Sequence, residues 1–354
     1  MKNTFKASLF LTIPMVLAAS SCKKSNSDDP QQTSTLKAQI LADVSANVCT
    51  SSYQDMLDKA NVLQSAVTAL TTTPTDANLN SARTAWKNMR VTWEETEAWL
   101  FGPVEADKID PRIDTWPVDF TQLDQILKSN DELTEAYVDN LDDALKGFHP
   151  IEYLLWGQNG TKTAASFTAR EKAYLTSLTQ NLVKLTTSVR NTWSNGYNKQ
   201  LATAGAGSTE FTTQQAAYVQ LVDAMHDICE EVANSKMKEP FDSQDASKEE
   251  SPFAKNSIID FTNNIKGIMI MYQGNFSVDG KGIEDLVRAN NLSLDAEIKS
   301  KYAAAIAALG TFSVPFGQAI VSEPTKVQNA MTKINDFAST LDEKLKPFIL
   351  QQVK

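Results

Sequence analysis

Apolar residues recur three and four positions apart along most of the chain, which is the spacing of one face of an α-helix. The clearest apolar stripes run through residues 86–100, 175–193, 219–232 and 330–345. No stretch alternates apolar and polar residues convincingly, as a half-buried strand would. We therefore expect an all-α protein whose helices each bury one face in a core.

Glycine, proline and short polar residues gather at a few places and interrupt this pattern. The predicted breaks are residues 71–75, 101–117, 157–163, 205–209, 240–252 and 275–282. They divide the chain into roughly eight to ten helices, as in a helical bundle protein. The breaks at 101–117 and 240–252 are predicted to be long non-helical insertions.

Short motifs near the two insertions resemble each other, which indicates an internal duplication. Residues 118–121 (Val-Asp-Phe-Thr) resemble residues 259–262 (Ile-Asp-Phe-Thr), and an Ile-Glu pair follows each of them. Matches this short also arise by chance. We predict two helical bundles related by duplication and joined with long loop insertions, the first over residues 36–205 and the second over residues 206–354.

The first 22 residues have the features of an export signal. A basic start precedes an apolar run at residues 9–17, which is too short to span a bilayer stably, and small residues then lead to Cys22. This arrangement resembles a bacterial lipobox, in which the cysteine is acylated, and an ordinary signal cut near Ser21 is the alternative. Residues 23–35 are polar and are predicted to be a flexible tether. The expected location is the bacterial cell envelope, lipid-anchored at the outer membrane, on its periplasmic or surface face.

Charge, hydropathy and cysteine content exclude some partners and structural features. The net charge is -10, which repels nucleic acid, so we expect no nucleic-acid partner. No segment after the signal has 18 consecutive apolar residues, so we expect no transmembrane helix. Cys49 and Cys229 lie on apolar helical faces. A disulfide between them is conceivable, but two buried free thiols are the preferred interpretation.

One of the two histidines of the chain lies in a Gly-x-His-x-x-Glu motif that begins at Gly147. Because Pro150 suits the first turn of a helix, His149 and Glu152 are expected to project from the same helical face. An imidazole and a carboxylate together suit zinc, ferrous iron, copper or manganese. The spacing alone does not predict a metal site, because His-x-x-Glu pairs also occur on solvated helix surfaces.

Acidic residues near the first insertion could complete a metal site. Glu94 and Glu97 lie three apart before the insertion, and Asp114 lies within it, beside Arg112 and Trp116. If the insertion folds over the motif helix, one histidine and two or three carboxylates would surround a cation. We rank Glu97 first as an additional ligand, followed by Glu94 and Asp114. The alternative is that these acids are solvated and that Arg112 pairs with one of them.

Several longer strings resemble the imelysin family. They are residues 97–103 (Glu-Ala-Trp-Leu-Phe-Gly-Pro), 112–117 (Arg-Ile-Asp-Thr-Trp-Pro) and 147–157, with residues 242–274 similar to the second half of the family. The resemblance implies a two-bundle helical fold, a Gly-x-His-x-x-Glu motif near the junction of the bundles, and a link to bacterial iron acquisition. Residues 109–114 also resemble a domain of periplasmic ferrous-iron uptake proteins, in which acids matching Glu94 and Glu97 help form the metal site.

The favoured function is an envelope-anchored module for iron uptake that binds a divalent metal, iron or zinc, or a small iron-related ligand, together with envelope uptake partners. The first alternative is a metal-dependent peptidase, because the family name comes from a reported insulin-cleaving enzyme. Tyr153 stands where an inverted zinc-peptidase motif has its second histidine, which weakens this alternative. The second alternative is a structural or adhesion lipoprotein in which His149 caps a helix and Glu152 holds Arg112. His226, beside Asp227, is expected to be a partly exposed helix residue.

Overall fold

The structure, a computed structural model, describes residues 30–354, and this part of the chain contains helices and no strand. The all-α prediction is confirmed. Cys22, the export signal at 1–22 and most of the tether at 23–35 lie outside the described residues. Helix α1 begins at Pro30, so the last residues of the predicted tether are helical.

The helices have the following bounds: α1 (Pro30–Asp43), α2 (Ser51–Thr72), α3 (Asp76–Thr96), α4 (Pro103–Ala106), α5 (Ile109–Asp114), α6 (Phe120–Lys128), α7 (Glu135–Asp139), α8 (Phe148–Trp156), α9 (Ala169–Thr192), α10 (Asn198–Ala202), α11 (Gln214–Glu231), α12 (Lys238–Ser243), α13 (Ser257–Gln273), α14 (Ile283–Asn290), α15 (Leu292–Leu309), α16 (Phe316–Ser322), α17 (Pro324–Thr340) and α18 (Lys346–Gln352). Short π-helical segments continue α1 into α2, α9 into α10, α11 into α12 and α17 into α18.

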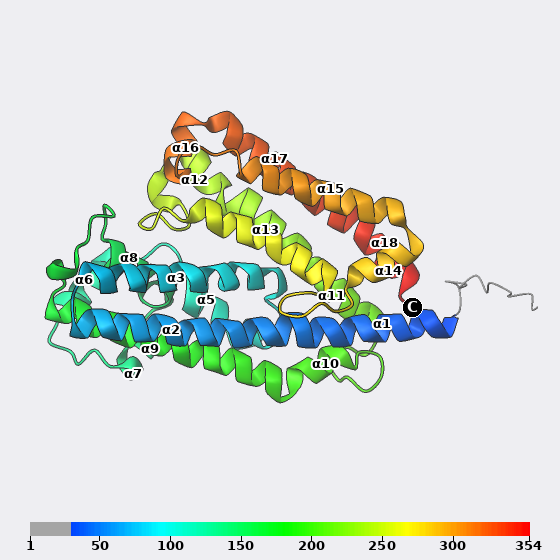
Figure 1. Cartoon of the computed structure of the whole chain (residues 1–354), viewed down its shortest axis with the longest axis horizontal. Coiled ribbons are helices and arrows are strands. Elements are labelled where there is room, and N and C mark those ends of the chain that lie inside the picture. The colour runs from blue at the N-terminus through cyan, green and yellow to red at the C-terminus, as the bar shows by residue number, and fades with distance from the viewer. Residues whose placement is uncertain (1–29) are drawn as a thin grey trace, which may run out of the picture.

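The long helices form two groups that lie against each other (Figure 1). In the first group, α2 packs along both α3 and α9, and the predicted stripe of α3 is fully buried at Trp86, Met89 and Trp93. In the second group, α15 packs on α17, and α11 and α13 complete the layer. Burial of these apolar stripes is the main stabilising term for such an arrangement.

Helices α3 and α13 join the two groups. Gly267 of α13 faces the backbone of α3 so closely that a Cβ atom added there would lie 2.2 Å from the carbonyl oxygen of Glu95. Only glycine allows the two backbones to approach to this distance. The last turns of α3 and the middle of α13 therefore meet, and their polar side chains share one buried space.

The two predicted insertions are more ordered than the sequence indicated. Residues 101–117, predicted to be non-helical, contain α4 and α5, and residues 240–252 contain part of α12 and a short 3-10 turn. These helices are too short for a clear periodicity, which explains why the pattern missed them. Asp114 is the last residue of α5, and Glu250 lies in the irregular segment 249–256 that precedes α13.

Cys49 and Cys229 are both buried and free. Burial raises the pKa of both thiols well above the usual range, which makes them inert toward oxidation and metal binding. Among the described residues, no helix combines the length and apolar character needed to cross a membrane.

Candidate metal centre

Gly147 determines where the motif helix α8 begins. Its φ of 79° lies in the region that favours glycine, and an added Cβ atom would lie 2.1 Å from the carbonyl oxygen of Ile113 in α5. A larger residue would push α8 and α5 apart. Gly147 therefore lets His149, in the first turn of α8, approach Asp114 at the end of α5.

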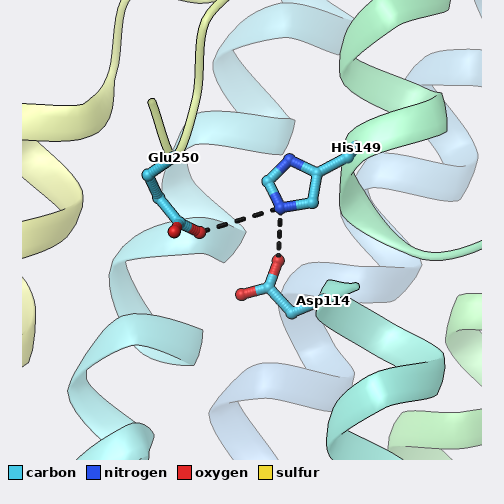
Figure 2. Close-up of side chains that lie close together, drawn as sticks. All are labelled: Asp114, His149 and Glu250. Carbon is cyan, nitrogen blue, oxygen red and sulfur yellow. Dashed lines mark ion pairs between the residues drawn. The ribbon is translucent and has the colours of Figure 1, made fainter. Parts of the chain in front are cut away.

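His149 is fully buried among three carboxylates. Its Nε2 atom lies 3.1 Å from Oδ1 of Asp114 and 3.7 Å from Oε1 of Glu250, as Figure 2 shows. On the other side of the ring, Nδ1 lies 3.4 Å from Oε2 of Glu152. Asp114, His149 and Glu250 place one potential ligand atom each within 4.8 Å of one another. These three residues are called the triad below.

Glu152 contacts the Nδ1 side of the His149 ring, opposite the side that faces Asp114 and Glu250. Its Oε1 atom accepts hydrogen bonds from the backbone amides of Phe253, at 2.9 Å, and Ala254, at 2.7 Å. Its Oε2 atom faces Nδ1 of His149 and favours a proton on that nitrogen. The lone pair of a neutral His149 would then lie on Nε2, toward the two other carboxylates.

The Nε2 atom of His149 is buried and lacks a hydrogen-bond partner in proper alignment, although Asp114 and Glu250 are near. Burial lowers the pKa of His149, but the Asp114 and Glu152 carboxylates outweigh burial and raise it to about 9. At neutral pH the imidazole of the metal-free protein is therefore protonated on both nitrogens. A metal ion bound at Nε2 would replace the proton on that nitrogen.

Arg90 is a fully buried cation beside the triad. Its guanidinium group pairs with Glu94 and Asp114 and lies 2.8 Å from Oε1 of Glu250 and 3.5 Å from Oδ1 of Asp260. The same group lies 5.0 Å from the ring centre of Phe148. Arg90 is thus fixed on several sides and holds the carboxylates of both helix groups together.

Lys236, at the end of the π-helical segment Val232–Lys236, is a second cation in the cluster. Its Nζ atom lies 2.7 Å from Oε2 of Glu97 and 3.5 Å from Oε2 of Glu94. The amide of Asn264 in α13 donates to both of these carboxylates, at 2.5 Å and 2.7 Å. Glu94 and Glu97 are therefore bound to Arg90, Lys236 and Asn264 rather than to His149.

The buried cluster carries more acids than bases, even with His149 protonated; its acids are Glu94, Glu97, Asp114, Glu152, Glu250 and Asp260, and its bases are Arg90, Lys236 and His149. Burial raises the pKa of Asp260 to about 7, and it raises that of Glu97 well above the usual range, helped by the charge of Glu94. Burial also opposes ionisation of Asp114, but Arg90 and His149 hold its pKa well below normal. Burial and mutual repulsion therefore oppose ionisation of some of these acids, and a bound cation would favour their charged forms.

An acidic cavity of about 190 Å³ borders the carboxylates of the triad. Its lining includes Asp114 and Glu250 of the triad and the aromatic ring of Trp116. The remaining lining residues are Glu97, Asp110, Glu231, Ser235, Lys236, Glu239 and Lys248. Burial and the nearby charge of Asp114 raise the pKa of Asp110 to about 7. The cavity thus brings solvent up to the two carboxylates of the triad, and the acids along it attract cations.

The structure brings together part of the predicted site. Asp114 and His149 meet, Glu152 supports the ring, and the ring of Trp116 lies 4.9 Å from that of His149. Arg112 lies elsewhere: it pairs with Asp139 at 2.5 Å, so the expected contact between Glu152 and Arg112 is wrong. The physical reason is that both Glu152 oxygens are already taken by Phe253, Ala254 and His149.

Four members of the cluster were missed by the sequence analysis, namely Arg90, Lys236, Glu250 and Asp260. Arg90 had a signal, because a charged residue four positions after Trp86 and three before Trp93 lies on a buried face. Glu250 and Asp260 lie within the strings that resemble the imelysin family, but their spacing gives no indication of a ligand. His226 is partly exposed and contacts Asp227 at 3.1 Å, away from the cluster.

Comparison with known proteins identifies the family of the chain. The family model of Imelysin, the peptidase M75 group, matches residues 49–343. The chain belongs to the imelysin family. Iron-regulated protein A of Synechococcus elongatus is 29% identical over 307 residues, which cover 84% of this chain and 83% of that protein. The resemblance seen in the sequence is thereby confirmed.

Two crystal structures share the fold of this imelysin-family chain. A candidate iron-regulated protein A precursor from Parabacteroides distasonis has a TM-score of 0.81 at 21% identity, over 90% of this chain and 95% of that one. An imelysin-like protein from Psychrobacter arcticum has a TM-score of 0.72 at 15% identity, over 89% of this chain and 96% of that one. At these identities the two structures support the fold alone.

Proposed function

We propose that this imelysin-family protein binds a divalent metal ion, iron in the first place and zinc as the alternative, at Asp114, His149 and Glu250. The observation that carries the proposal is the Nε2 atom of His149, which is buried, lacks an aligned partner and faces two carboxylates. Glu152 favours the ring tautomer that a metal requires on that side.

The donor set fits the proposed ion. One imidazole nitrogen and two carboxylates suit ferrous iron, zinc or manganese, whereas calcium prefers oxygen ligands alone. A divalent cation would compensate the negative charge of these buried carboxylates. The relation to an iron-regulated protein favours iron. We therefore treat iron as the cargo of an uptake module, delivered to or received from envelope partners.

Metal titration tests this proposal. The protein, purified without chelator and kept anaerobic, is expected to bind one Fe²⁺ per chain at micromolar concentration near neutral pH, and His226→Ala is expected to bind equally well. Casein and insulin are offered in parallel, because a metallopeptidase would cleave them in step with metal loading. Absence of transition-metal binding by the unaltered protein would contradict both metal-dependent functions and favour a structural role for the motif.

The location is proposed on separate grounds, because Cys22 and the export signal lie outside the described residues. We propose a lipid anchor at Cys22 on the outer membrane. Acyl chains contribute about 0.8 kcal/mol per buried methylene, so the acylated protein should resist washing from membranes. Cys22→Ala is expected to appear in the soluble fraction, and its persistence in the membrane fraction would exclude this anchor.

A further inference from the structure

Lys236 differs from the other cation of the cluster in how it is held. Arg90 is fully buried and packs on aromatic rings, whereas Lys236 lines the acidic cavity and has no cation–π contact among those observed. Its side chain is 9% exposed. The Lys236 ammonium group can therefore move toward the cavity, while the Arg90 guanidinium group cannot.

The Lys236 ammonium group and the triad share one carboxylate. Oε1 of Glu250 faces Nε2 of His149, and Oε2 of the same residue lies 3.8 Å from Nζ of Lys236. The ammonium also lies 3.9 Å from Oε1 of Glu231, an acid of the cavity wall. A cation at the triad and the ammonium of Lys236 would thus compete for the charge of Glu250.

We infer that Lys236 is a resident counter-ion that limits the affinity of the triad for a divalent metal, and that its ammonium group moves toward the cavity wall when the metal binds. This inference rests on the proposed metal-binding function. In the metal-free protein the ammonium offsets the charge of Glu97 and Glu250 and stabilises the empty cluster. In the loaded protein it repels the metal, so the ion is held reversibly, as cargo must be.

The Lys236 ammonium group has an acidic partner in the metal-free protein, Glu97, and another in the metal-loaded protein, Glu231. Glu97, at 2.7 Å, holds it in the structure, and Glu231, half exposed at 51%, offers a partner nearer to solvent. The movement needs only side-chain rotation, because Lys236 is unbranched and flexible. Lys236 thus acts on the metal through its charge and is not a metal ligand.

The test removes the charge of Lys236 and measures affinity for Fe²⁺ alone, by anaerobic competition with a chromogenic chelator. Lys236→Gln, which keeps a hydrogen-bond donor for Glu97, and Lys236→Met are both expected to tighten binding at least about tenfold, because repulsion between nearby cations is strong in a poorly solvated site. Lys236→Arg, which restores the charge, is expected to bind like the unaltered protein. A role in folding alone would weaken Fe²⁺ binding in Lys236→Gln and Lys236→Met, whereas the inference predicts tighter binding.

Lys238→Gln is the matched control, because it removes the same charge two residues away, where Lys238 is 50% exposed and pairs with Asp242. Its affinity for Fe²⁺ is expected to remain unchanged. If folded Lys236→Gln and Lys236→Met bind Fe²⁺ no more tightly than the unaltered protein, the inference is overturned. That result leaves the proposed function intact provided that His149→Ala still abolishes binding, whereas failure of the unaltered protein to bind metal overturns both.

Discussion

Replacing His149 by alanine is expected to abolish metal binding, because it removes the one nitrogen ligand of the triad. Asp114→Asn and Glu250→Gln are expected to weaken binding by more than about 100-fold, since each removes a charged ligand, whereas Glu152→Gln should weaken it by roughly 10- to 100-fold, the range for residues that orient a ligand. The measurement is isothermal titration with Fe²⁺ or Zn²⁺.

A control variant and a check of folding accompany these substitutions. His226→Ala removes the other histidine, which lies outside the cluster, and should bind like the unaltered protein. Circular dichroism and thermal melting of every variant separate loss of a ligand from loss of the fold. Equal binding by His149→Ala and His226→Ala would place the metal away from the triad.

Replacing Arg90 by methionine is expected to have the largest effect on stability. Arg90 contacts Glu94, Asp114, Glu250 and Asp260, and its side chain is inaccessible to solvent. Removing one partner of such a buried network leaves carboxylates without their counter-ion and costs about 3–5 kcal/mol. Urea unfolding, with the free energy extrapolated to water, measures the loss.

Arg112→Met is the matched control for this prediction. Arg112 pairs with the single acid Asp139, and 27% of its side chain is exposed. An ion pair of this kind contributes about 0–1 kcal/mol, so the free energy of unfolding should change little. Similar losses in the two variants would show that Arg90 does not hold the cluster together.

The fold was largely predictable because each long helix buries one stripe. Trp86, Met89 and Trp93 are spaced for a single helical face, and all three are fully buried. The insertions were less predictable, because α4 and α5 are stabilised by contacts with distant segments rather than by their own periodicity. Gly147 illustrates this: its need for glycine comes from the carbonyl of Ile113, which no local pattern reveals.

The candidate site was predictable only where its chemistry is local. His149 and Glu152 share a helix turn, and Asp114 could be placed near them by assuming that the insertion folds back. Glu97 was ranked first as a further ligand because of its position before the insertion, yet the structure places it against Lys236. Glu250 lies in the segment before α13, and the packing of α13 against α3 brings this segment close to His149. The spacing of residues along the chain does not predict that contact.

Anomalous X-ray diffraction from crystals soaked anaerobically in Fe²⁺, with Zn²⁺ as a second ion, shows directly where the metal binds. We expect one strong anomalous peak within roughly 2.0–2.2 Å, the distance typical of such ligands, of Nε2 of His149 and of carboxylate oxygens of Asp114 and Glu250. A peak at His226 or among the outer acids of the cavity, with none at the triad, would contradict this expectation.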